Sequence, residues 1–306
     1  MKVSVIGAGN VGGTLTQRLA ESGLCEVVLL DILEGIPEGK AFDLHDCRGV
    51  LGFDSQVQGT HNYQDIAGSD VVVVTAGLAR QPGMTREDLL KKNTSIIEQI
   101  VKNIVKFTPD CILIMVTNPL DVLTNIAFKI SGFDAKRVMG MGGVLDSARF
   151  ANLIAEELNV PVSSIEALVI GAHGQAMLPL ARLSRVKGEP LSKFLSLIEQ
   201  NKLVEKTINR GAEIVKRLGK GSAYYAPSAA AFTMIKSIIC DEKKVMPACV
   251  YLSGEYNIKG VCIGVPVRLG KQGAEEIINL DLTHDEQTKL LDCAQSIKKQ
   301  INSISK

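Results

Sequence analysis

Two arginines have the residue type and the spacing expected of a site that handles an acidic small molecule. Arg80 and Arg86 stand in a Gly/Pro-marked segment, residues 78–86, that follows the apolar run 70–77. Guanidinium groups bind carboxylates through two parallel hydrogen bonds. Two of them on one segment beside a buried strand suggest a lid that closes over an anion. The alternative is that both are ordinary solvated loop arginines, because exposed arginine is common.

Asp146 and Arg149 form a second charged pair, three residues apart at the start of a predicted helix. This spacing places both side chains on one helix face, which continues into the apolar residues Phe150, Leu153 and Ile154. Ionised groups are rarely buried without partners. The two charges therefore either pair structurally or line a ligand cavity.

His173 lies in a glycine-containing turn, residues 171–174, after a predicted strand from Ala167 to Ile170. A histidine in an apolar setting is often a satisfied core residue, but imidazole titrates near pH ~6.5 and can accept and return a proton at neutral pH. A carboxylate would orient its ring and favour the imidazolium, and Asp146 is the natural candidate. We interpret the other histidines as surface residues: His45, His61 and His284.

The first glycine cluster, Gly7-Ala8-Gly9-Asn10-Val11-Gly12, has the G-x-G-x-x-G pattern and stands between a predicted strand, Lys2 to Ile6, and a helical stretch, Thr14 to Ala20. In this pattern the first glycine allows a tight turn, the second lets the backbone approach a pyrophosphate, and the third lets helix and strand pack closely. The helix N-terminus offers free amides to the phosphates. The motif predicts a dinucleotide site.

Asp31 ends the second predicted strand, Glu26 to Leu30, 19 residues after Gly12. At this place a carboxylate would accept hydrogen bonds from the adenosine ribose and would repel a 2′-phosphate. The next residues, Ile32 and Leu33, bring no cation to offset that repulsion. This favours NAD over NADP as the cofactor.

The elements that position these residues divide the chain into two halves. In the first half, continuous apolar runs alternate with helical patterns, most clearly from Arg86 to Phe107, which predicts a Rossmann-type doubly wound parallel sheet. The predicted strands are Lys2 to Ile6, Glu26 to Leu30, Val71 to Val74, Ile112 to Val116 and Arg137 to Met141.

The second half predicts an α+β substrate domain. Helices are expected at about Ser147 to Leu158, at about Leu191 to Leu218 and after Thr283, and the runs Ala248 to Leu252 and Val261 to Val267 read as an antiparallel pair. We place an NAD-binding domain at residues 1–145 and a substrate-binding, catalytic domain at 146–306, sharing an extensive interface.

The composition narrows the class of protein. The chain has 306 residues, of which 46% are hydrophobic and 22% charged, as in an ordinary globular protein. A net charge of +1 argues against a nucleic-acid or anionic-membrane surface. No apolar run reaches the roughly 18 residues that cross a bilayer, and the N-terminus does not resemble a secretory signal. We expect no nucleic-acid partner and no membrane association.

The seven cysteines are scattered, with no Cys-x-x-Cys spacing. This pattern predicts reduced thiols, no metal site and a cytoplasmic protein. Cys111 and Cys262 fall within apolar runs, so we expect both in the core.

Six motifs occur in order along the chain: Gly7-x-Gly9-x-x-Gly12, Thr75-Ala76-Gly77, residues 80–86, Val116-Thr117-Asn118-Pro119, residues 144–150 and Gly171-Ala172-His173-Gly174. Their ordered set resembles the lactate/malate dehydrogenase family, in its lactate-dehydrogenase-like malate branch, over essentially the whole chain. The resemblance implies an enzyme that reversibly oxidises (S)-malate to oxaloacetate with NAD, as in the tricarboxylic acid cycle.

The same resemblance implies roles for individual residues. His173 would be the general acid/base, Asp146 would stabilise its protonated ring, and Arg149 would hold the C1 carboxylate. Arg86 would polarise the C2 oxygen. Asn118 would bond to substrate and nicotinamide ribose, although a strand-ending Asn-Pro turn also explains it. The implied cofactor-binding residues are Gly7, Ala8, Gly9, Asn10, Val11, Gly12, Asp31, Thr75, Ala76, Gly77, Asn93, Val116 and Asn118.

Arg80 separates the branches of this family. In the lactate branch its position holds an uncharged glutamine, whereas an arginine there implies pairing with the second carboxylate of oxaloacetate. Gln175 departs from the family, which usually has aspartate after His-Gly. Ser222 and Ala223, expected on the facing pocket wall, are small enough to leave room for a four-carbon diacid.

Other functions stay open at this point. The chain could be a lactate or other 2-hydroxyacid dehydrogenase, or a non-catalytic NAD-binding sensor, although a sensor needs only the half from Gly7 to Asp31. The family is normally a homodimer or a homotetramer, and the sequence does not choose between them.

Overall fold

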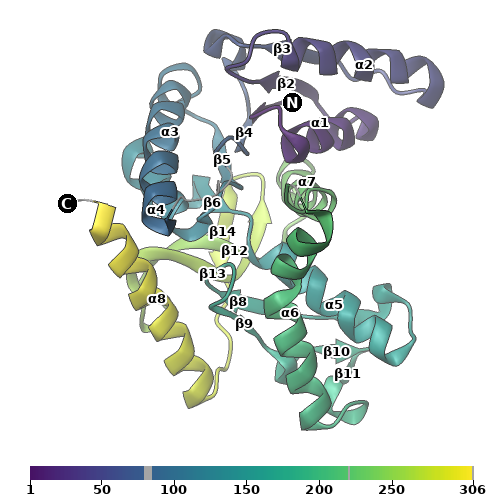
Figure 1. The fold of residues 1–306 in the computed structure, drawn as a ribbon, viewed down its shortest axis with the longest axis vertical. Helices are drawn as coiled ribbons and strands as arrows, with labels where there is room; N and C mark the ends of the chain where they lie inside the picture. Colours follow the sequence, from purple (N-terminus) through teal and green to yellow (C-terminus); the bar gives the residue numbers. More distant parts are fainter. Residues whose placement is uncertain (79–84, 220, 305–306) are drawn as a thin grey trace.

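One sheet runs through both halves of the chain. The structure, a computed structural model, describes residues 1–78, 85–219 and 221–304, without the side chain of Arg86 (Figure 1). The strand order is β3-β2-β1-β4-β5-β6-β12-β13-β8-β9, with β14 paired to β13. These strands are β1 (Lys2–Ile6), β2 (Glu26–Leu30), β3 (Val57–Thr60), β4 (Val71–Val74), β5 (Ile112–Met115), β6 (Val138–Gly140), β8 (Val169–Gly171), β9 (Met177–Pro179), β12 (Lys244–Ser253), β13 (Lys259–Gly270) and β14 (Gly273–Ile277).

The remaining elements cover the sheet or extend it. The helices are α1 (Asn10–Ser22), α2 (Ile36–Leu51), α3 (Arg86–Phe107), α4 (Leu120–Ser131), α5 (Gly143–Leu158), α6 (Leu197–Leu218), α7 (Tyr225–Ile239) and α8 (His284–Ile304). A small separate sheet contains β7 (Ile165–Glu166), β10 (Arg185–Val186) and β11 (Glu189–Pro190). Short 3₁₀ helices are η1 (Tyr63–Ile66), η2 (Ala135–Arg137), η3 (Val162–Ser164), η4 (Ala181–Leu183), η5 (Leu191–Lys193) and η6 (Glu255–Asn257).

The six strands from β1 to β6 are parallel, which confirms the Rossmann-type prediction for the first half. Their continuous apolar sequences are buried on both faces, as in β4, where all four valines have no exposed area. Helices α3 and α4 pack together on one side of these strands, and α1 packs against α7 on the other (Figure 1). Chain order reverses between β1 and β4, so the loops after both strands meet at the carboxyl edge.

The second half joins this sheet through the antiparallel pair of β6 with β12 and extends it through that of β8 with β13. β12 pairs with β6 at Cys249 and Gly140, and β13 pairs with β8 at Gly264 and Gly171. A Cβ at Gly264 would lie 2.6 Å from the carbonyl oxygen of Gly171, closer than any such contact allows. Glycine at this crossing therefore lets β8, and the turn that carries His173, dock on the sheet.

The predicted antiparallel pair is confirmed, although β12 and β13 are longer than the apolar runs that indicated them. The helix expected from Ser147 begins at Gly143, so Asp146 lies in its first turn. The stretch expected to be helical from Leu191 contains a 3₁₀ turn before α6, because Ser196 and Glu199 form a capping box that starts the helix at Leu197.

The sequence analysis missed α2, which carries a weak amphipathic pattern. It buries Pro37 and Ala41, whereas Phe42 is 68% exposed. The apolar face predicted for α5 is buried: Phe150, Leu153 and Ile154 belong to a second hydrophobic cluster. Cys111 and Cys262 are in the core, as predicted. No helix within the described ranges has the length and apolar character needed to cross a membrane.

Candidate active site

A cavity of about 460 Å³ opens at the carboxyl edge of the parallel strands. The loops after β4, β5 and β8 contribute to its lining, together with α5, α6 and the segment that leads into α7. It thus contacts both halves of the chain. Residues from the predicted site that line it are Val11, Thr75, Gly77, Val116, Asn118, Arg149 and His173, and Gln175, Ser222 and Ala223 line it as well.

His173, Asp146 and Arg149 form one hydrogen-bonded chain beside this cavity. Asp146 Oδ2 lies 2.8 Å from His173 Nδ1, and its Oδ1 accepts a hydrogen bond from Arg149 Nη1 at 3.1 Å. The Asp146 side chain is only 2% exposed. The two readings of the Asp146–Arg149 pair are therefore both correct: the charges pair, and Arg149 also lines the cavity.

The environment of His173 favours its charged form. Burial acts to lower the pKa of His173, but the charge and the hydrogen bond of Asp146, joined by the charge of Asp121, outweigh it and hold the pKa above 6.5. The carboxylate fixes Nδ1 as a donor, so Nε2 is the ring nitrogen free to exchange a proton with a ligand. The arrangement can take up a proton and return it.

Arg149 keeps binding capacity beyond its bond to Asp146. Its Nε is buried and has no hydrogen-bond partner among the residues that the structure describes. A buried donor left without a partner costs about 1–3 kcal/mol. Gly211 of α6 faces the guanidinium, where a Cβ would lie 3.6 Å from Nη1, so the small residue leaves room beside it. A ligand carboxylate would satisfy this orphaned group.

The structure describes less of the two arginines of the predicted lid, Arg80 and Arg86. Arg80 lies outside the described residues, and for Arg86 the structure gives the backbone, which begins α3. The start of α3 is fixed by a capping box in which Thr85 Oγ1 accepts from the N–H of Asp88 at 3.0 Å and Asp88 Oδ2 accepts from the N–H of Thr85 at 3.1 Å.

The glycine-rich loop between β1 and α1 fits a dinucleotide. Gly7 has a φ of +104°, and a Cβ at Gly12 would lie 1.8 Å from the carbonyl oxygen of Gly7, so the turn itself requires both glycines. A Cβ at Gly9 would meet no described atom within 4 Å. The fold does not need glycine there, but a close phosphate would. No side chain of the described residues caps α1, which leaves its first amides available.

Two side chains hydrogen-bond to the backbone of Ala8 in this loop, one at its N–H and one at its carbonyl. Asp31 Oδ2 accepts a hydrogen bond from the Ala8 N–H at 2.6 Å, and Lys40 Nζ donates to the Ala8 carbonyl at 2.6 Å. The sequence analysis missed Lys40 because it lies on α2, which was not predicted. These two hydrogen bonds hold the loop in shape, and the Lys40 ammonium group lies near the predicted ribose site.

Asn93 connects the loops that follow β4 and β5. Its side chain is 1% exposed; Oδ1 accepts from the Leu78 N–H at 2.8 Å, and Nδ2 donates to the carbonyls of Leu78 at 3.2 Å and Asn118 at 2.9 Å. Thr75 Oγ1 donates to the Gly7 carbonyl at 3.0 Å. These bonds hold the predicted cofactor loops together through their backbones.

Asp121, on α4, is a further residue that the sequence analysis did not single out. It is 6% exposed and accepts a hydrogen bond from the backbone N–H of His173. Its only local signal is a carboxylate in an apolar helix start, Leu120-Asp121-Val122-Leu123, and helix starts favour acids for their own sake. Of the other histidines, His61 and His284 are exposed, whereas His45 is half-buried and its Nε2 accepts from the Val57 N–H.

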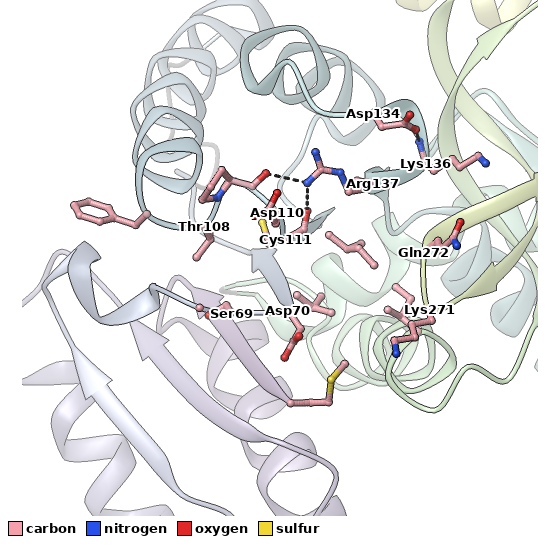
Figure 2. A pocket seen from close by; sticks show the side chains of 17 residues that line it. Ser69, Asp70, Thr108, Asp110, Cys111, Asp134, Lys136, Arg137, Lys271 and Gln272 are labelled. Carbon is pink, nitrogen blue, oxygen red and sulfur yellow. Dashed lines mark hydrogen bonds between the residues drawn. The ribbon is translucent and has the colours of Figure 1, made fainter.

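A larger cavity of about 820 Å³ lies at the amino ends of the parallel strands, and Figure 2 shows the side chains that line it. Its lining carries charges of both signs, and Arg137 Nη1 there donates to the carbonyls of Pro109 and Cys111. As far as the structure describes it, this lining includes none of the predicted site residues. Ligands of open parallel sheets bind at the carboxyl edge, so the smaller cavity is the candidate active site. Within the described ranges no group of His, Cys, Asp and Glu could hold a metal ion.

The glycine pair of the loop gives a test of the dinucleotide site. We expect Gly12→Ala to lower the free energy of unfolding by about 1–3 kcal/mol or more, because its Cβ collides with the Gly7 backbone. Gly9→Ala should leave the unliganded melting temperature near wild type but weaken NADH binding at least ~10-fold, about 1.4 kcal/mol. Thermal melts and NADH fluorescence titrations measure both effects. Wild-type NADH affinity in Gly9→Ala would contradict the site.

Comparisons with known proteins agree with these features. Residues 1–140 match the family model described as "lactate/malate dehydrogenase, NAD binding domain", and residues 143–306 match "lactate/malate dehydrogenase, alpha/beta C-terminal domain". The chain is 50% identical over 303 residues to a malate dehydrogenase of Methanosarcina barkeri, with 99% of both chains covered.

Two solved structures also resemble this chain over nearly its whole length. The malate dehydrogenase of Salinibacter ruber superposes with a TM-score of 0.95 at 43% identity, covering 100% of this chain and 98% of the other. A lactate dehydrogenase of Cryptosporidium parvum, in complex with lactic acid and nicotinamide adenine dinucleotide, gives a TM-score of 0.96 at 38% identity, with 99% and 98% covered.

Proposed function

This chain belongs to the lactate/malate dehydrogenase family, and from that premise we propose how its own residues carry out the reaction. It is an NAD-dependent oxidoreductase that interconverts malate and oxaloacetate, as its curated relatives do. The observation that carries the proposed mechanism is the chain of hydrogen bonds from His173 through Asp146 to Arg149 at the edge of the cavity.

In this mechanism His173 moves the proton. With Nδ1 bonded to Asp146, Nε2 accepts the proton of the malate C2 hydroxyl and returns it in the reverse direction. The imidazolium that forms is stabilised by Asp146, whose carboxylate is almost fully buried. Bound NAD supplies the acceptor for the hydride that leaves C2. General acid–base catalysis by a positioned histidine contributes about 10²–10⁴ in rate.

The arginines and Asn118 hold the substrate in this proposal. Arg149 grips the C1 carboxylate with the edge that carries its orphaned Nε. Arg86 polarises the C2 oxygen as charge develops there, and Asn118 donates a hydrogen bond from the loop after β5. Arg80 pairs with the second carboxylate and so selects a diacid.

For the cofactor, we propose that the amides of residues 9–12 hold the pyrophosphate and that Asp31 binds the adenosine ribose. Its Oδ2 already accepts the Ala8 N–H, so a ribose hydroxyl would add to an oriented carboxylate. Asn93 acts through the backbones of Leu78 and Asn118, which border the nicotinamide end. The Gly9 and Gly12 variants above probe this assignment.

We propose that the domain boundary lies between residues 145 and 146.

We also propose that the chain assembles as a homodimer or a homotetramer. The proposed location of this assembly is the cytoplasm. The assembly is supported by apolar side chains left exposed on α2, α6 and α7, among them Phe42, Leu218 and Tyr225. Light scattering measures the number of chains. The cysteines are free, which suits a reducing compartment.

A paired substrate assay tests the function. With NADH, we expect kcat/KM for oxaloacetate to exceed that for pyruvate by at least ~10³, because a monoacid would leave Arg80 unpaired in a closed site. The loss of NADH absorbance measures both rates on one enzyme preparation. A preference for pyruvate would show instead a lactate dehydrogenase, and no turnover of either substrate would favour an NAD-binding sensor.

A further inference from the structure

Asp121 ties the turn that carries His173 to helix α4. It lies in the first turn of α4, and its Oδ2 accepts the backbone N–H of His173 at 2.8 Å across 52 residues of sequence. The ring of His173 is held at Nδ1 by Asp146 on α5. The histidine is thus gripped at its ring by one helix and at its backbone by another.

Asp121 carries a charge that a residue serving only to hold the His173 turn in place would not need. Its Oδ1 is buried and makes no conventional hydrogen bond within the described residues, although the weak thiol donor of Cys249 interacts with the carboxylate. Asn125, one turn later on α4, shows how an anchor is built: its Nδ2 donates to the Cys262 carbonyl at 3.3 Å, and its Oδ1 accepts from the Cys262 N–H at 2.9 Å. An amide holds the strand there without a buried charge. At position 121 the chain carries a carboxylate instead, and with it a buried charge.

Asp121 is one of a few charged groups that face His173. Asp146 and Arg149 approach from α5, and Asp121 approaches from α4. The nearby thiols, Cys249 of β12, Cys262 of β13 and Cys293 of α8, stay neutral because burial raises the pKa of each.

Asp121 itself is mainly ionised at neutral pH. Burial raises the pKa of Asp121 to about 6, and the charge and backbone N–H of His173 limit the rise. The Asp121 carboxylate therefore adds a second negative charge, after that of Asp146, to the charges that act on His173.

We propose that Asp121 is a positioning residue for the reaction: its carboxylate fixes the His173 backbone against α4 and places a second negative charge near the imidazolium. This inference rests on the proposed role of His173. It assigns to α4, which supplies no group to the reacting atoms, a share in setting the proton affinity of the ring.

The test compares Asp121→Asn with Thr124→Val. Asn keeps the shape and can still accept the His173 N–H, but it removes the charge. Thr124 is fully buried on the same helix and donates to the Leu120 carbonyl, so its variant perturbs α4 without contacting His173. Both variants and wild type are assayed for oxaloacetate reduction with NADH from pH 5.5 to 9, with melting temperatures measured in parallel.

Removing the charge should lower the proton affinity of His173. Oxaloacetate reduction needs the imidazolium, so its fall at high pH should begin about one pH unit lower in Asp121→Asn, which is about a 10-fold loss at pH 8. Near pH 6 the rate should approach that of wild type, KM for NADH should change less than about 2-fold, and the melting temperature should equal or exceed that of wild type. Thr124→Val should keep the wild-type pH profile.

An unchanged pH profile in Asp121→Asn would overturn the proposal and leave Asp121 a structural residue. If the Asn variant does not fold, Asp121→Ser is the second variant, whose hydroxyl can accept the same N–H and whose profile must shift in the same direction. Failure of the proposed function would appear differently, because wild type itself would then not oxidise NADH with oxaloacetate.

Discussion

Replacing His173 with asparagine is expected to lower kcat by at least ~10³ in both directions. The buried Asp146 would still find a hydrogen-bond donor in the new amide, so the pocket keeps its shape, but no group would remain to accept and return the proton. General acid–base catalysis is worth about 10²–10⁴, and the loss falls on kcat because the substrate carboxylates bind elsewhere. Stopped-flow and steady-state NADH absorbance measure the rates.

The pH dependence gives this prediction a second readout. Because the pKa of His173 is held above 6.5, chiefly by Asp146 acting against burial, oxaloacetate reduction should persist into the neutral range and decline as the ring deprotonates. Malate oxidation should rise over the same interval. Both dependences should vanish in His173→Asn. His284→Asn, an exposed histidine on α8, is the matched control and should behave as wild type. Unchanged NADH oxidation in His173→Asn would refute the mechanism.

Replacing Arg80 with glutamine is expected to invert the substrate preference. The ratio of kcat/KM for oxaloacetate to that for pyruvate should fall by at least ~10³. If Arg80 binds the second carboxylate as proposed, a monoacid leaves its guanidinium without an anion in a closed site, which costs several kcal/mol, whereas in the variant the diacid brings an unpaired carboxylate. Rates with both 2-oxo acids, measured on both proteins at one pH, give the ratio.

Arg149→Gln is the control for this selectivity. Arg149 is proposed to bind the C1 carboxylate, which both substrates share, so its loss should lower kcat/KM for both alike and leave the ratio within about 5-fold of wild type. If Arg80→Gln also lowered both rates equally, Arg80 would be a general anion-binding residue, and the choice of malate would have to come from another part of the pocket.

Much of the fold could be predicted because its signals are local. The valines of β4 and the apolar stripe of α3 identify a buried strand and an amphipathic helix without reference to the rest of the chain. The helix α2 could not be predicted in this way, since several of its large apolar residues are exposed and its buried residues, Pro37 and Ala41, give only a weak apolar face. The joining of the second half to the sheet depends on contacts such as Cys249 with Gly140, between residues far apart in sequence.

The same distinction applies to the site. Asp146 and Arg149 could be paired from sequence because they lie on one helix turn, and His173 could be assigned to Asp146 because few carboxylates suit it. Asp121 could not be found, since an acid at a helix start is favoured by the helix dipole alone. Its partner is a backbone N–H in another part of the chain, and backbone groups carry no sequence signature.

The glycine-lined crossings of the shared sheet have a mechanical consequence. Because β6 of the first half pairs with β12 of the second, rotating the two halves about a hinge would break hydrogen bonds inside the sheet. The two halves therefore cannot rotate apart as rigid bodies to open the base of the cavity. The Asp146 carboxylate and the His173 imidazole are already hydrogen-bonded to each other, so in the proposed mechanism they cost little reorganisation when charge moves. Any motion that admits substrate and expels water must come from segments outside the sheet.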